Sequence, residues 1–182
     1  IEGTDSNSTQ WYFIALYFSA HTILMISTLI YRPQLFKLAS LLETSIHNPA
    51  NKKRFGVIVL ALFGAIAVVT IGTAAFVEFI GIPLNGFLYG VDFEQYRGLA
   101  RIMVATGGLC AAIDFLYQLI TIMRVQKAVT RAYLISFAVS IPIIWMMVSF
   151  TGLNGAVIGS FSSTLILFLL LISEYAVARM KN

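Results

Sequence analysis

The residue best suited to chemistry within a membrane is Asp114, which lies in the apolar run Gly108–Lys127, GLCAAIDFLYQLITIMRVQK. A charge at the centre of a membrane-spanning helix costs about 3 kcal/mol, so acids there usually face a cavity, a partner or an ion. At helical spacing its face also carries Gly107, Cys110, Ala111, Gln118 and Thr121. We therefore expect Asp114 and Gln118 to face the bundle or a wet cavity. Asp114 would bind a proton, a cation or a polar substrate there, or serve packing alone through a hydrogen bond.

The opposite face of the same run is bulky and apolar. Its members are Leu109, Ile113, Leu116, Ile120 and Met123. In membrane bundles, small and polar side chains pack against neighbouring helices, whereas bulky apolar side chains can meet lipid. This pattern predicts that the bulky face of the run contacts the bilayer.

A second polar stripe lies in the first apolar run. At helical spacing it contains Gln10, Tyr17, His21, Thr28 and Arg32. His21 could titrate or bind a polar group, or it could only donate one hydrogen bond to a backbone carbonyl. Tyr17 is a cavity candidate on the same face. Arg32 is expected to extend its guanidinium to the headgroups at the membrane surface.

Glu78 and Arg101 lie near the ends of two further runs. Glu78 shares a face with small residues and is expected to reach outer water, although it remains a cavity candidate. Arg101 lies one turn into its run and is expected to extend outward. It is roughly 20 Å along the helix from Asp114, so the two side chains cannot pair.

These residues are carried by an all-α polytopic membrane protein. Hydrophobic residues make up 59% of the 182 residues and charged residues only 11%, whereas soluble domains have about 25% charged residues. Five runs reach the length of about 20 residues that a spanning helix needs; they are 11–31, 55–80, 99–123, 132–150 and 156–177. Between the first two, residues 34–46 have leucines on one side and predict an amphipathic helix in the membrane interface.

The basic residues predict the orientation of these spans. Ten of the twelve lie in regions that share one side if the spans alternate: Arg32, Lys37, Lys52, Lys53, Arg54, Arg124, Lys127, Arg131, Arg179 and Lys181. Basic loops stay in the cytoplasm. We therefore expect a multi-pass cell-membrane protein with its N-terminus outside and its C-terminus inside. The positive net charge of +4 follows from this topology and does not indicate a nucleic-acid partner.

Signatures of enzymes, metals and cofactors are missing from the sequence. It contains one cysteine and two histidines, with no HExxH motif and no glycine-rich nucleotide-binding loop. We expect no catalytic residues, no metal site and no cofactor.

Four stretches together resemble a known family. LIYRPQLFKLASLL, GIPLNGFLYGVDFEQYR, TIMRVQK and GLNGAVIG follow one another in this order. Their sequence and spacing resemble bacterial polysaccharide flippases of the multidrug/oligosaccharidyl-lipid/polysaccharide exporter superfamily. That resemblance implies two helical lobes around a central cavity, of which this chain would be most of the C-terminal lobe. The N-terminal lobe would be missing, and with it most of the family's cationic cavity residues.

The resemblance implies export of lipid-linked oligosaccharide or polysaccharide precursors by alternating access, for capsule, exopolysaccharide or cell-wall synthesis. The expected partners are the lipid-linked sugar, the bilayer and the N-terminal lobe of the same protein. One alternative is a multidrug or small-molecule antiporter of the same fold. An alternative from another class is an accessory or scaffold subunit of a polysaccharide-synthesis complex, which does not itself transport.

Overall fold

The computed structural model describes residues 2–45, 49–81, 83 and 97–181. Nearly all of these positions are helical, and none of them lies in a strand. The helices are α1 (Glu2–Ser45), α2 (Pro49–Phe76), the π-helical turn η1 (Val77–Gly81), α4 (Arg97–Ile122), α5 (Gln126–Thr151) and α6 (Leu153–Lys181). The predicted all-α class is confirmed. Residues 84–96, which carry most of one family-like stretch, lie outside the described residues.

Four segments are long and apolar enough to cross a membrane. They are Ala50–Gly81, Arg97–Ile122, Gln126–Gly152 and Asn154–Met180. Each coincides with one of the last four predicted spans, within a few residues at either end. The chain is therefore a helical membrane protein, as its composition predicts.

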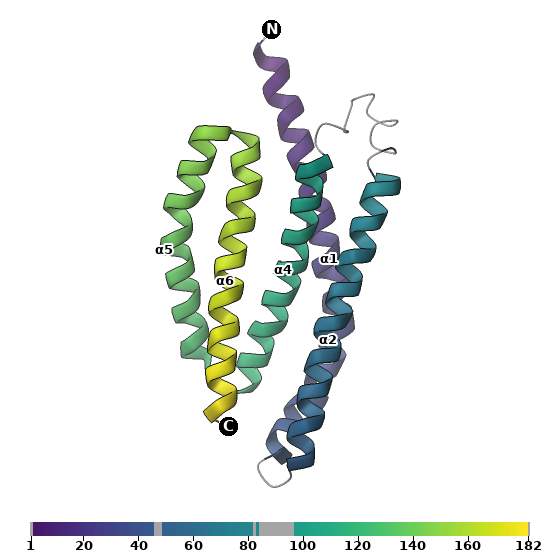
Figure 1. Ribbon diagram of the computed structural model, residues 1–182, viewed down its shortest axis with the longest axis vertical. Coiled ribbons are helices and arrows are strands. Elements are labelled where there is room, and N and C mark those ends of the chain that lie inside the picture. The colour runs from purple at the N-terminus through teal and green to yellow at the C-terminus, as the bar shows by residue number, and fades with distance from the viewer. Residues whose placement is uncertain (1, 46–48, 82, 84–96, 182) are drawn as a thin grey trace.

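Helix α1 is longer than the predicted first span. It continues through Pro33, so residues 34–45 extend the same helix. Their leucine side is covered by protein, because Leu38 is buried with Phe55 and Val59 of α2, and Leu35 packs against this cluster. In Figure 1 the lower parts of α1 and α2 project together beyond the end of α6. The predicted place of this segment in the membrane interface stays a prediction.

Helix α4 lies between two helix pairs. It packs against α1 and α2 on one side and α6 on the other (Figure 1). The prediction that its bulky face meets lipid is therefore wrong for most of that face. Ile113, Leu116 and Ile120 are buried in a cluster with residues of α5 and α6, and Met123 is buried as well. Two faces of a helix can both be covered when neighbours lie on both sides.

Close approach of α4 to α1 and α2 depends on two adjacent glycines. A Cβ atom on Gly107 would lie 2.6 Å from the backbone of Ala20 in α1. A Cβ atom on Gly108 would lie 2.6 Å from the side chain of Thr70 in α2. No larger residue fits either position without movement, so this glycine pair sets the spacing of the three helices.

The basic regions of the chain lie at one end of the bundle. The end of α1, the start of α2, the α4–α5 turn and the end of α6 lie toward one end (Figure 1). These are the regions in which the basic residues gather. At the opposite end, Gly152 joins α5 to α6 with φ 56° and ψ −123°, a conformation that favours glycine. The arrangement agrees with alternating spans, and the side of the membrane that each end faces stays a prediction.

Candidate functional site

Asp114 accepts a hydrogen bond from another helix. The hydroxyl of Tyr31 in α1 donates to Asp114 Oδ2 across 83 residues of sequence. The Tyr31 hydroxyl oxygen also lies 3.1 Å from Thr28 Oγ1. Thr28 Oγ1 is in turn 2.7 Å from the carbonyl oxygen of Leu24. A short polar chain therefore runs from the backbone of α1 through Thr28 and Tyr31 to the carboxyl group on α4.

The Tyr31 side chain is held firmly in place. The residue is 0% exposed, and its ring packs against Phe115 of α4 with a centroid distance of 5.2 Å. Phe63 of α2 also meets Phe115 edge-on, with a centroid distance of 5.1 Å. This aromatic row spans α1, α4 and α2. It fixes the position from which the Tyr31 hydroxyl reaches Asp114.

Asp114 also lines an open groove. The groove has a volume of about 390 Å³ and lies among α1, α4, α5 and α6. We call it the hydroxyl groove, because its polar lining consists of Cys110, Asp114, Tyr133, Ser136, Ser140, Ser163 and Thr164. Apolar residues such as Leu24, Phe137 and Leu167 complete the walls. Asp114 thus contacts a buried tyrosine and also faces a cavity lined with hydroxyls.

The groove forms where the helices separate. Helix α5 packs mainly on α6 and only slightly on α4, so its polar side remains open toward Asp114. The hydroxyl of Ser163, on α6, is buried and has no hydrogen-bond partner in the described part of the chain. A buried hydroxyl without a partner costs stability unless water or a ligand satisfies it. Ser163 thus adds an unsatisfied hydroxyl to the lining of the groove.

The acids of the bundle have different partners. Glu78 and Glu174 each form an ion pair with arginine, whereas the partner of Asp114 is the phenol of Tyr31. A neutral donor stabilises a carboxylate less than a guanidinium does. Among the described residues, the carboxyl group of Asp114 therefore has a neutral partner, whereas those of Glu78 and Glu174 have charged ones.

The structure does not bring Tyr17, His21 or Arg32 of the predicted α1 stripe to Asp114. Tyr17 is 56% exposed and stacks on the exposed His21 at 6.4 Å. Arg32 is also exposed. The buried ridge of α1 contains Ala20, Ser27 and Tyr31, so it is displaced by one residue, about 100° around the helix, from the predicted stripe. The side chain of Gln10 lies outside the described part of the chain.

Gln118 stays close to the site, and Glu78 does not. Gln118 is half-buried on α4, one turn from Asp114. Glu78 lies at the other end of the bundle. Arg101 donates hydrogen bonds to both of its carboxylate oxygens there, from Nη2 at 2.7 Å and from Nε at 3.1 Å. Arg97 Nε is 3.4 Å from Glu78 Oε1. Glu78 and Arg101 are therefore paired with each other rather than extending independently to water, and this pair joins η1 to the start of α4.

Sequence reasoning missed Tyr31, and it also missed Tyr133, Ser136, Ser140 and Thr164 of the groove lining. Tyr31 lies at the edge of the predicted first span, where a tyrosine is usually explained as an interfacial anchor. A signal was present, because Leu24, Tyr31 and Leu38 follow one another at seven-residue spacing. That spacing marks the side of a helix that faces a partner. A tyrosine on such a side needs a buried hydrogen-bond partner.

Comparison with known proteins adds no family assignment. No protein-family model, no curated protein and no solved structure matches the chain. Within the described residues, no three histidine, cysteine or acidic side chains are grouped closely enough to hold a metal ion.

Proposed function

We propose that the chain forms the C-terminal lobe of a flippase for lipid-linked oligosaccharides, with the hydroxyl groove as part of its polar pathway. The observation that carries this proposal is the lining of the groove. Polar side chains among membrane-spanning helices usually line a wet cavity or bind a polar ligand. Sugar hydroxyls donate and accept hydrogen bonds, and the serine, threonine and tyrosine hydroxyls of the groove do the same.

Alternating access supplies the transport step. The lobe rocks against the other half of the transporter, so the groove faces each side of the membrane in turn. The sugar headgroup passes through the polar pathway while the lipid tail remains in the bilayer. The resemblance to the exporter superfamily supports this arrangement, as does the open side of α5 toward α4.

Asp114 is the proposed coupling residue. Its negative charge strengthens the hydrogen bond that it accepts from Tyr31, and protonation weakens that bond. A change of charge at Asp114 therefore alters how strongly α4 is held to α1. A proton taken up from the groove would in this way bias the position of α1.

An antiporter of small cationic molecules is the second candidate. The favouring observation is that Asp114 has a phenol partner and no ion pair with any residue that the structure describes, which leaves its charge available to a cation in the groove. Transport of a cationic dye into vesicles by the full-length protein, abolished by Asp114→Asn, would favour this candidate. Export of polysaccharide by the same protein would favour the flippase.

The test uses two substitutions in the full-length protein. Asp114→Asn keeps the shape and removes the charge, so we expect normal protein level, reduced polysaccharide export and loss of pH dependence. Asp114→Leu should abolish export. Wild-type export by Asp114→Leu at unchanged protein level would refute any functional role. Loss of protein with Asp114→Leu, together with full activity of Asp114→Asn, would show that Asp114 serves packing alone.

A further inference from the structure

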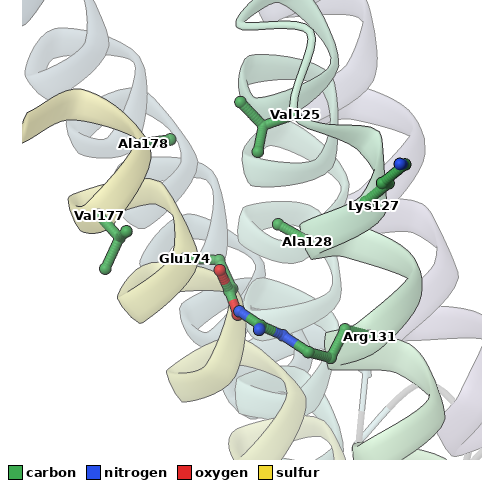
Figure 2. A pocket seen from close by; sticks show the side chains of 7 residues that line it. All are labelled: Val125, Lys127, Ala128, Arg131, Glu174, Val177 and Ala178. Atoms are coloured by element: carbon green, nitrogen blue, oxygen red, sulfur yellow. The ribbon is translucent and has the colours of Figure 1, made fainter. Parts of the chain in front are cut away.

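A cavity separate from the hydroxyl groove lies between the start of α5 and the end of α6 (Figure 2). It has a volume of about 400 Å³. Val125 and Ala128 of the α5 side and Val177 and Ala178 of α6 form its apolar walls. The cavity lies at the end of the bundle where the basic residues gather, and Glu174 is about 15 Å along α6 from Thr164 of the hydroxyl groove.

Three charged side chains border this cavity. Arg131 donates hydrogen bonds from Nε, at 3.1 Å, and from Nη2 to the single oxygen Glu174 Oε1. Nη1 of Arg131 takes no part in these bonds, so its two N–H groups remain to bind another acceptor. The Arg131 side chain is 65% exposed and that of Glu174 only 16%. Glu174 therefore fixes the guanidinium at the mouth of the cavity and leaves its outer edge reachable.

Lys127 adds a second positive charge at the rim of the cavity, and in Figure 2 its side chain extends away from the guanidinium of Arg131. It precedes Arg131 by one helical turn and also lines the cavity. With Glu174 included, the three charges leave a net positive site. An ammonium group and the free edge of a guanidinium suit a phosphate, which offers several acceptor oxygens.

The surroundings of the cavity favour a lipid over a soluble anion. Leu134 follows Arg131 by three residues and is 65% exposed, and the exposed Ile135 lies beside it. On α6, Val177 and Leu169 present further exposed apolar surface. Basic cavities between spanning helices at the membrane surface recognise anionic lipid headgroups. A phospholipid has both the phosphate for the basic pair and the acyl chains for the apolar faces beside it.

We propose that this cavity binds the phosphate headgroup of an anionic phospholipid of the bilayer. Nη1 of Arg131 donates to the phosphate oxygens, the exposed side chain of Lys127 turns from its position in Figure 2 to bring its ammonium to the headgroup, and the acyl chains lie along the exposed faces of α5 and α6. This assignment does not depend on the transported substrate, because the cavity is distinct from the hydroxyl groove.

Lipid titrations of the detergent-purified full-length protein, followed by native mass spectrometry, test the assignment. The probes are phosphatidylglycerol, phosphatidylcholine and soluble glycerol 1-phosphate. We expect tighter retention of phosphatidylglycerol than of phosphatidylcholine. Lys127→Gln should raise the apparent Kd for phosphatidylglycerol about fivefold, the effect of one basic residue near a lipid surface. The control Lys52→Gln removes the same charge from an exposed position on α2 and should leave the Kd unchanged.

A second variant removes the ion pair without leaving an unpaired charge. Arg131→Gln combined with Glu174→Gln should also weaken phosphatidylglycerol binding, because only Lys127 remains. If this variant does not fold, the comparison of Lys127→Gln with Lys52→Gln is sufficient to test the proposal. Equal retention of the two phospholipids, or equal behaviour of Lys127→Gln and Lys52→Gln, would overturn the proposal. Displacement of lipid by glycerol 1-phosphate at matching concentration would identify a site for soluble anions and overturn the lipid assignment.

Discussion

The two sides of α4 are packed in different ways. On one side, α4 lies against α1 and α2 in a seam formed by Ala20, Tyr31, Phe63, Gly107 and Phe115, in which glycines and tilted or edge-on rings pack closely. On the other side, α5 stands away from α4 and the hydroxyl groove opens. Asp114 belongs to both sides. The same helix thus provides a rigid support and one wall of a polar cavity.

This contrast suggests how a mid-membrane acid is tolerated. The seam supplies one fixed hydrogen bond from Tyr31, and the groove supplies access to water or ligand. An acid in the seam alone would be sealed from proton exchange, and an acid in the groove alone would lack a fixed orientation. A functional carboxyl group needs a supporting contact that holds its geometry.

The largest expected difference between the two sides is their access to water. With Cys110 replaced by serine, a cysteine introduced at Ser140, in the groove, should react at least about tenfold faster with a small polar thiol reagent than one introduced at the fully buried Ser27. Both substitutions change only oxygen to sulfur, so the fold is retained. The test is to measure the reaction rates of the two cysteines with the reagent in the full-length protein in membranes. Equal rates would mean that the groove is not wet.

The next largest effect concerns the fit of the seam. Gly107→Ala should destabilise the protein by about 3 kcal/mol, because the added methyl group meets the immobile backbone of Ala20. Thermal unfolding in detergent measures the change. The matched control is Gly64→Ala on α2, where nothing lies within 4 Å of the new atom, and which should be neutral or slightly stabilising. Similar melting temperatures for the two variants would contradict the tight seam.

The spanning helices could be predicted from the sequence, and their neighbours could not. An apolar run of sufficient length is a local property, so the last four predicted spans coincide with the four helices that are long and apolar enough to cross a membrane. The two faces of α4 were also recognised by their periodicity. Their environments were not, because periodicity does not say how many helices surround a given helix. Ile113 and Leu116 were therefore assigned to lipid although both are buried.

The contacts of the candidate site show the same limit. Asp114 and Gln118 were found because each is polar within an apolar run. Tyr31 was missed because its partner lies 83 residues away, and no local pattern links the two. Glu78 and Arg101 were both noticed, but the pair itself arises only when η1 meets the start of α4. The polar residues of a membrane segment can thus be identified from the sequence, whereas their hydrogen-bond and ion-pair partners are known only once the packing of the helices is known.

The smallest expected effect separates two tyrosines near Asp114. Tyr31→Phe removes the donor to the carboxyl group, so we expect a loss of about 1.5 kcal/mol in the free energy of unfolding. Tyr133 lines the groove on α5 and is 41% exposed, so Tyr133→Phe leaves stability unchanged. Thermal or denaturant unfolding of both variants in detergent provides the comparison.

A double mutant tests the origin of this effect. If the loss of stability reflects the hydrogen bond, Tyr31→Phe should lower the free energy of unfolding by less in an Asp114→Leu background, where the acceptor is absent. The same cost in both backgrounds would assign the effect of the Tyr31 hydroxyl to its contact with Thr28, and the two sides of α4 would then not be linked through Asp114.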